Sequence, residues 1–209
     1  MTNNCTTIDE KLWPRSAHCA AFRNCVEPAF CVTFETDVTG FRQRVRERAS
    51  RSPWRRCARR RTASRISATA LRTGAAFTFL DAETELFKVM RVPFEGSMEE
   101  FARKTSRAAR EQEAYFTGSL ENDVFQCSPL PWLSFTHISH TNSGRKDCAT
   151  PLFDWGKFIE RGGRMVMPVS VQTHHSFVDG LHVARFAERL QAFFDGGIGE
   201  YSVNALHNV

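Results

Sequence analysis

The stretch that decides the fold is "RMVMPVSVQTHHSFVDGLHVARFAERLQ", residues 164–191. Its first part, residues 164–175, is a long and nearly continuous apolar run, which predicts a strand. From Leu181 to Phe194 the apolar residues recur at steps of three and four, which predicts an amphipathic helix packed on a sheet. The chain is therefore expected to pass from a long strand through a short turn into a helix.

Two adjacent histidines lie where this strand ends. Because side chains alternate along a strand, His175 is expected on the predicted core-facing side and His174 on the other. An imidazole that is partly desolvated at the end of an apolar face favours its neutral form and can accept a proton. His175 is therefore a candidate general base. The core-facing residues of the strand are Met165, Met167, Val169, Val171 and Thr173.

Two other interpretations of the histidine pair stay open. Both rings could simply be packed in the core. A metal site would need a third ligand, which His182, His137 or His140 could supply, but regular ligand spacing is missing. Asp179 is expected to fix the turn by accepting backbone N–H groups at the helix entrance, and if buried it needs a basic partner from elsewhere.

The remaining periodicities predict an alternation of strands and helices before the histidine motif. Ser97 and Glu100 form a capping box that opens the predicted helix at 97–116. Strands are predicted at 33–38, 75–80, 86–94, 132–138 and 151–160. A further helix is predicted at 40–49, and a hairpin turn at 161–164.

The composition suits one globular domain over residues 1–209, since 42% of the residues are hydrophobic. No window approaches the roughly 18 apolar residues of a membrane span, and the first residues lack a secretory pattern. We therefore expect a soluble cytoplasmic protein with no membrane partner. The seven cysteines include no C-x-x-C pair, which favours free thiols and no cysteine-based metal site.

The charge is distributed unevenly along the chain. Residues 42–72 hold twelve arginines and one acid, Glu47, which gives +11 and leaves −6 for the rest of the +5 protein. One anomalous segment at about 42–75 therefore supplies the whole excess.

Several motifs together carry a family resemblance. The H-H-x-x-x-D-G pattern at residues 174–180 resembles the signature of the CoA-dependent acyltransferases. The surrounding sequence is similar to the trimeric chloramphenicol acetyltransferases, as are four further segments that keep the family order. These segments are "IDEKLWPR" (8–15), "TDVTGF" (36–41), "ETELF" (83–87) and "PLPWLSFT" (129–136).

The resemblance implies a fold and a reaction. The fold would be a two-layer α/β sandwich, a mixed β-sheet covered by helices, assembled as a homotrimer. The reaction would be direct transfer of acetyl from acetyl-CoA to a hydroxyl of chloramphenicol, with no acyl-enzyme and no metal. His175 would be the general base, and Ser128, four residues before Trp132, would stabilise the oxyanion.

The family pattern also implies supporting residues. Asp179 would be structural and paired with Arg15. Phe22, Phe87 and Phe135 fall at or near positions of an aromatic substrate pocket between subunits, although the sequence alone leaves ordinary core packing open for each.

The chain departs from the family at two places. The family has a mostly apolar helix and strands where this chain has "SPWRRCARRRTASRISATALRTGA", and buried unpaired guanidinium groups are costly. We hypothesise that about residues 50–75 are translated out of frame; a genuine insert binding CoA phosphates or nucleic acid is the alternative. The second departure is Asp154, where the family commonly has threonine.

Three other functions stay open at this point. The acceptor could be another hydroxylated xenobiotic. The chain could be an inactive family member damaged at 50–75. A basic nucleic-acid-binding protein would rest wholly on residues 42–72 and is the least expected of the three.

Overall fold

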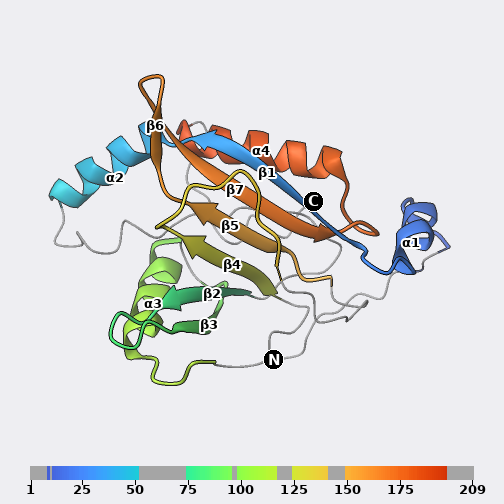
Figure 1. Cartoon of the computed structure of the whole chain (residues 1–209), viewed down its shortest axis with the longest axis horizontal. Helices are drawn as coiled ribbons and strands as arrows, with labels where there is room; N and C mark the ends of the chain where they lie inside the picture. The colour runs from blue at the N-terminus through green and yellow to red at the C-terminus, as the bar shows by residue number, and fades with distance from the viewer. Residues whose placement is uncertain are drawn as a thin grey trace.

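The computed structural model describes residues 9, 11–51, 74–95, 98–116, 124–140 and 149–196 (Figure 1). This part of the chain contains four helices and seven strands. In chain order they are α1 (Ser16–Arg23), β1 (Ala29–Asp37), α2 (Thr39–Arg51), β2 (Gly74–Leu80), β3 (Phe87–Pro93), α3 (Met98–Glu111), β4 (Val124–Leu130), β5 (Leu152–Gly156), β6 (Ile159–Arg161), β7 (Arg164–His174) and α4 (Gly180–Phe194).

The strands form one mixed sheet in the order β1-β7-β5-β4-β2-β3, with the short β6 paired to β7. The pairs β2–β4 and β4–β5 are parallel, and the other pairs are antiparallel. Helices α3 and α4 bury side chains in the same core against this sheet. The expected two-layer α/β sandwich with a mixed sheet is therefore confirmed.

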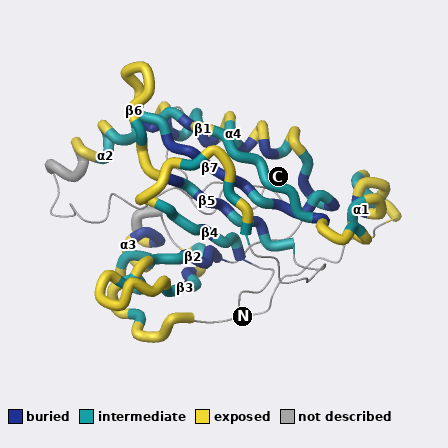
Figure 2. The backbone as a smooth tube through the Cα atoms, in the orientation of Figure 1, coloured by how far each residue is buried: buried dark blue, intermediate teal, exposed yellow. Residues whose placement is uncertain are grey.

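Strand β7 lies between β1 and β5 and organises the sheet around it. Its register puts Val171 opposite Val32 of β1 and Phe153 of β5. The strand is exposed at Arg164 and buried from Met167 to Val171 (Figure 2). A strand buried on both sides of the sheet explains the nearly continuous apolar run in the sequence.

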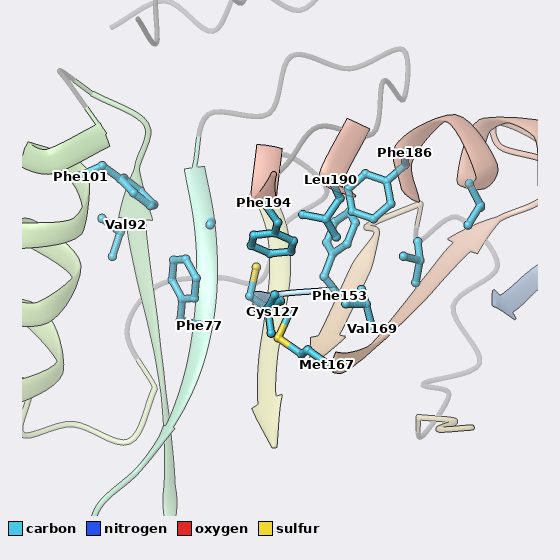
Figure 3. Packing of buried hydrophobic residues seen from close by; sticks show 14 of the residues in the cluster. Phe77, Val92, Phe101, Cys127, Phe153, Met167, Val169, Phe186, Leu190 and Phe194 are labelled. Atoms are coloured by element: carbon cyan, nitrogen blue, oxygen red, sulfur yellow. The ribbon is translucent and has the colours of Figure 1, made fainter. Parts of the chain in front are cut away.

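The main core lies between the sheet and the helices (Figure 3). Phe153 of β5 has its ring centroid 5.4 Å from that of Phe186 on α4 and 5.8 Å from that of Phe125 on β4. Phe77 of β2 lies 6.1 Å from Phe101 of α3. Aromatic packing therefore joins both helices to the middle of the sheet.

The predicted strand at 132–138 is wrong. The strand comes earlier, as β4, and residues 131–140 form an irregular segment that crosses the face of the sheet opposite α3 and α4 (Figure 1). Pro129 and Pro131 concealed the strand, because proline is unusual inside a sheet. Gly156 of β5 allows the crossing, because an added Cβ would lie 2.6 Å from the Leu133 carbonyl oxygen.

The other strands and helices agree with the predictions except at four places. Helix α1 was not predicted, β1 begins at Ala29 rather than Thr33, α3 ends at Glu111 rather than 116, and the run at 151–160 divides into β5 and β6. Gly162 and Gly163 take positive φ angles in the predicted hairpin turn.

Several predictions fall outside the described residues. They are the Ser97 cap and the interpretations of the arginine-rich segment that depend on residues 52–73. Within the described ranges, no helix has the length and apolar character needed to cross a membrane.

Candidate functional site

His175 follows directly after β7, with its ring fixed between two aromatic side chains. Its backbone N–H donates to the Pro28 carbonyl at 2.8 Å. The imidazole stacks on Phe22 of α1 at 3.9 Å between centroids and 9° between planes, and it lies 4.5 Å from Phe30 of β1. Phe30 is the register partner of Thr173 and packs against the main core, so the ring lies on the side that strand alternation predicts.

The free nitrogen of this ring is the notable feature of the site. His175 Nδ1 is buried and has no hydrogen-bond partner in the described part of the chain. The ring is half-buried as a whole. Stacking rather than hydrogen bonding therefore sets its orientation, and Nδ1 is not committed to another side chain among the described residues.

His174 has a different environment from its neighbour. It is 7% exposed, and its Nδ1 accepts a hydrogen bond from the Ser176 N–H at 3.2 Å. Its ring lies 5.3 Å from that of Phe177. His174 is therefore a packed residue of the turn, which agrees with the expectation that the two histidines point to opposite sides.

Asp179 caps α4 and pairs with Arg15. Its Oδ1 accepts from the backbone N–H groups of Leu181 and His182, at 3.1 and 3.4 Å, and lies 2.7 Å from His182 Nδ1. Arg15 Nη1 lies 2.8 Å from the other oxygen, Oδ2. The Arg15 hydrogen bond is the main reason why the pKa of Asp179 lies well below its ordinary range, and the contacts of His182 add to it.

Helix α1, which the sequence did not predict, connects the turn at Asp179 with the His175 ring. It begins directly after Arg15 and carries Phe22, and its Cys19 carbonyl accepts from Ser176 Oγ at 3.3 Å. The same short helix therefore holds the turn through Asp179 and the imidazole through Phe22. The only signal for it was the aromatic and apolar content of residues 16–23, which is too short to show a helical period.

Ser128 lies in the middle of the sheet, on the face opposite the helices. It belongs to β4 rather than to a proline turn, and its Oγ accepts a hydrogen bond from Thr78 Oγ1 at 3.1 Å. This leaves the Ser128 hydroxyl proton available to another acceptor. Beside it is a cavity of about 50 Å³, enough for one or two waters. Its lining includes Ala76, Thr78, Val89, Gln126 and Ser128.

One chain does not bring Ser128 and His175 together. Ser128 faces away from α3 and α4, whereas the His175 ring lies beyond the end of β7 on the helical side. No hydrogen bond joins them among the described residues.

The three predicted pocket residues are also separate in one chain. Phe22 stacks on His175, and Phe135 lies over β5, where its ring approaches Gly156. Phe87, at the start of β3, is 56% exposed and packs edge-on against Phe116 at 6.1 Å. A single pocket containing all three would require contributions from more than one chain.

His140, predicted from the sequence only as a possible metal ligand, has a different partner in the structure. His140 Nε2 lies 2.9 Å from Oδ2 of the completely buried Asp154, while His182 contacts Asp179. Over the described ranges no three His, Cys, Asp or Glu residues are grouped as a metal site would need.

Comparison with known proteins shows what this chain is similar to. A family model described as chloramphenicol acetyltransferase matches residues 71–191. Chloramphenicol acetyltransferase 2 of Haemophilus influenzae is 30% identical over 92% of this chain and 98% of its own length. The chloramphenicol acetyltransferase of Streptomyces acrimycini is 29% identical over 88% of this chain and 91% of its own.

Solved structures share the fold. A chloramphenicol acetyltransferase structure has a TM-score of 0.73 at 22% identity, covering 91% of this chain and 99% of that chain. A truncated catalytic core of the 2-oxoacid dehydrogenase multienzyme complex from Thermoplasma acidophilum has a TM-score of 0.57 at 16% identity, covering 93% and 98%. Because the family model matches more than half of the sequence, this chain belongs to the chloramphenicol acetyltransferase family, and the prediction of an acyltransferase enzyme is confirmed.

Proposed function

We propose that the protein transfers acetyl from acetyl-CoA to a hydroxyl of chloramphenicol in a ternary complex. His175 takes the hydroxyl proton while the hydroxyl oxygen attacks the thioester carbonyl. Ser128 donates a hydrogen bond to the oxyanion of the tetrahedral intermediate. The intermediate then expels CoA thiolate, which receives the proton from His175, so no acyl-enzyme forms.

The observation that carries this proposal is the environment of His175. Its ring is fixed by Phe22 and Phe30 without a hydrogen bond from another side chain to Nδ1. A positioned imidazole whose nitrogens are not already engaged is what a general base requires. Asp179 and Arg15 act as support, because their ion pair fixes the turn that carries the ring.

We further propose that the site forms between subunits of a homotrimer. Ser128 and His175 do not meet within one chain, so two copies have to contribute them. Large apolar side chains are available for such contacts, because they are exposed in the isolated chain. They are Phe87, Phe116, Trp132, Leu133 and Phe158.

The acceptor is the least constrained part of the proposal. Any small molecule that presents a hydroxyl to His175 could react by the same steps, and another hydroxylated xenobiotic remains the alternative. Acetyl-CoA is the donor in either case, and no step requires a metal.

The test is thiol release from acetyl-CoA by the purified protein, with and without chloramphenicol. We expect chloramphenicol-dependent release that falls by at least a thousandfold in His175→Ala. The control is His18→Ala, which removes an exposed histidine from α1 and should leave turnover unchanged. Turnover that survives His175→Ala would overturn the assignment of the base. If a protein of the size of a trimer showed no turnover, chloramphenicol would be ruled out as the acceptor.

A further inference from the structure

A row of polar side chains crosses the face of the sheet that α3 and α4 leave free. It contains one residue from each of five neighbouring strands, namely Thr33, Ser170, Asp154, Ser128 and Thr78. We call these five residues the polar row. Ser128, the proposed oxyanion donor, therefore has a carboxylate as its direct neighbour in the sheet.

Among the described residues, Asp154 has a single hydrogen-bond partner. Its side chain is 0% exposed, Oδ2 lies 2.9 Å from His140 Nε2, and Oδ1 has no partner in the described part of the chain. No hydrogen bond joins the neighbouring hydroxyls of the row to Asp154 in the described part of the chain. Ser170 Oγ accepts from Thr33 at 3.1 Å and contacts Cys31 Sγ at 2.9 Å, while Ser128 Oγ accepts from Thr78.

The charge of Asp154 reaches the strands around it. Burial raises the pKa of Cys127 to about 12, and repulsion from Asp154 adds to that effect. Burial is also the main cause of the raised pKa of Cys31 on β1, to which Asp154 again contributes. The Asp154 carboxylate thus disfavours a second negative charge both towards β4, at Cys127, and towards β1, at Cys31.

The proposed reaction needs negative charge to develop at Ser128. Neighbouring strands lie about 4.8 Å apart, so an oxyanion bound to Ser128 would form within about two strand spacings of Asp154. An uncompensated carboxylate at that distance would slow the reaction through repulsion in a low-dielectric setting. We propose that His140 is a positioning residue that compensates the charge of Asp154, so that an oxyanion can form at Ser128.

This inference rests on the proposed function, and it differs from a purely structural role for His140. The segment 131–140 is also attached to the sheet by other bonds. The Lys157 N–H donates to the Leu133 carbonyl at 2.6 Å, and Cys31 Sγ lies 3.3 Å from the Ile138 carbonyl. If His140 only holds this segment in place, removing either member of the pair should impair activity. If it compensates charge, removing the carboxylate should relieve the need for it.

The test is a comparison of kcat among the unmodified protein, His140→Gln, Asp154→Asn and the double variant. Both substitutions nearly keep the size of the side chains, and they leave an amide donor at 140 and an acceptor oxygen at 154. We expect His140→Gln to lower kcat at least tenfold with little change in KM, and Asp154→Asn not to lower it. The double variant should recover at least fivefold over His140→Gln. A double variant as slow as His140→Gln would overturn the inference.

A second measurement separates this inference from the proposed function. The alkylation rate of Cys31 against pH, followed by mass spectrometry of its peptide, reports the charge balance beside it without any acetyl transfer. The pKa of the Cys31 thiol should rise in His140→Gln and fall in Asp154→Asn. An unchanged thiol pKa in both variants would overturn the inference even in an active enzyme. A protein inactive towards chloramphenicol would contradict only the proposed function.

Discussion

The two faces of the sheet carry different kinds of residues, although the same strands build both. Phe153 and Asp154 are neighbours in β5. Phe153 packs among aromatic rings beneath α4, whereas Asp154 is buried on the opposite face, with its carboxylate 2.9 Å from His140 Nε2. Because successive side chains of a strand point to opposite faces, one step along the chain separates a core residue from a polar site residue.

Substitutions on one face should therefore affect stability, and substitutions on the other should affect the reaction. The helical face contains the large apolar cluster, and the free face contains the polar row and Ser128. His175 lies outside this division, because it extends past the last residue of β7 and is held by α1. Variants on each face should therefore separate loss of folding free energy from loss of rate.

The largest effect is expected from the helical face. Phe186 is 4% exposed and contacts Phe34 and Phe153. Phe186→Ala should lower the free energy of unfolding by about 3–5 kcal/mol, because it leaves a cavity under α4. Urea denaturation at a fixed protein concentration measures this. The exposed neighbour Arg185→Ala is the control and should change it by less than about 0.5 kcal/mol. An equal loss of unfolding free energy in Phe186→Ala and Arg185→Ala would contradict a core centred on Phe186.

On the free face the effect should be on rate. Ser128→Ala should lower kcat by about 10²–10³, which corresponds to about 2.7–4 kcal/mol of transition-state stabilisation, with little change in stability. The matched control is Ser170→Ala, a serine of the same polar row two strands away. It should cost about 1 kcal/mol of stability through its lost hydrogen bonds and less than tenfold in kcat. The same fall in kcat for both serines would remove the special role of Ser128.

The sequence predicted the fold most successfully where periodicity was long. The run at 164–175 and the amphipathic repeat after it predicted β7 and α4 nearly to the residue. Strand β4 was hidden because its seven residues include Pro129, which a parallel ladder rarely accepts. Helix α1 was missed because eight residues give too few turns for a pattern.

The candidate site was predictable only in part, for a related reason. The geometry that joins Arg15 to Asp179 spans 164 residues, and only the family pattern suggested it. The contact between His140 and Asp154 depends on how an irregular segment crosses the sheet, which strand alternation cannot predict. The polar row depends on register among five strands, and register is a property of the folded sheet.

Asp179 offers a test that depends on pH. Its pKa is lowered in the folded protein, chiefly by Arg15, so its stabilisation is complete above the ordinary carboxyl pKa of about 4 and is lost as the pH falls below it. Asp179→Asn keeps a side chain able to cap α4 but removes the charge. It should cost about 1–2 kcal/mol at pH 7, reduced for partial exposure.

The measurement is the difference in unfolding free energy between the two proteins at pH 7 and pH 3. This difference should shrink at pH 3, because the unfolded chain takes up a proton at Asp179 near the ordinary carboxyl pKa, whereas the folded protein, in which this pKa is lowered, does not. Glu188→Gln, on an exposed position of α4, is the charge control and should change stability little at either pH. A cost that stays constant with pH would show that shape rather than charge matters at the turn.

The smallest effect tests whether the arginine-rich segment is uniform. Arg44 of α2 donates through Nη2 to the carbonyl groups of Phe193, at 3.5 Å, and Phe194, at the end of α4. A cation there satisfies terminal carbonyls and interacts favourably with the helix dipole. Arg44→Ala should therefore lower the free energy of unfolding by about 0.5–1 kcal/mol in urea denaturation.

Arg46→Ala is the matched control, because Arg46 lies exposed on the same helix two residues away. It should leave stability unchanged, or raise it slightly by reducing the local excess of positive charge. Equal losses in both variants would mean that Arg44 acts only as one member of a charge run. A loss of unfolding free energy in Arg44→Ala alone would mean that the fold uses an arginine near the start of the segment at 42–72. The unusual excess of arginine would then start after α2.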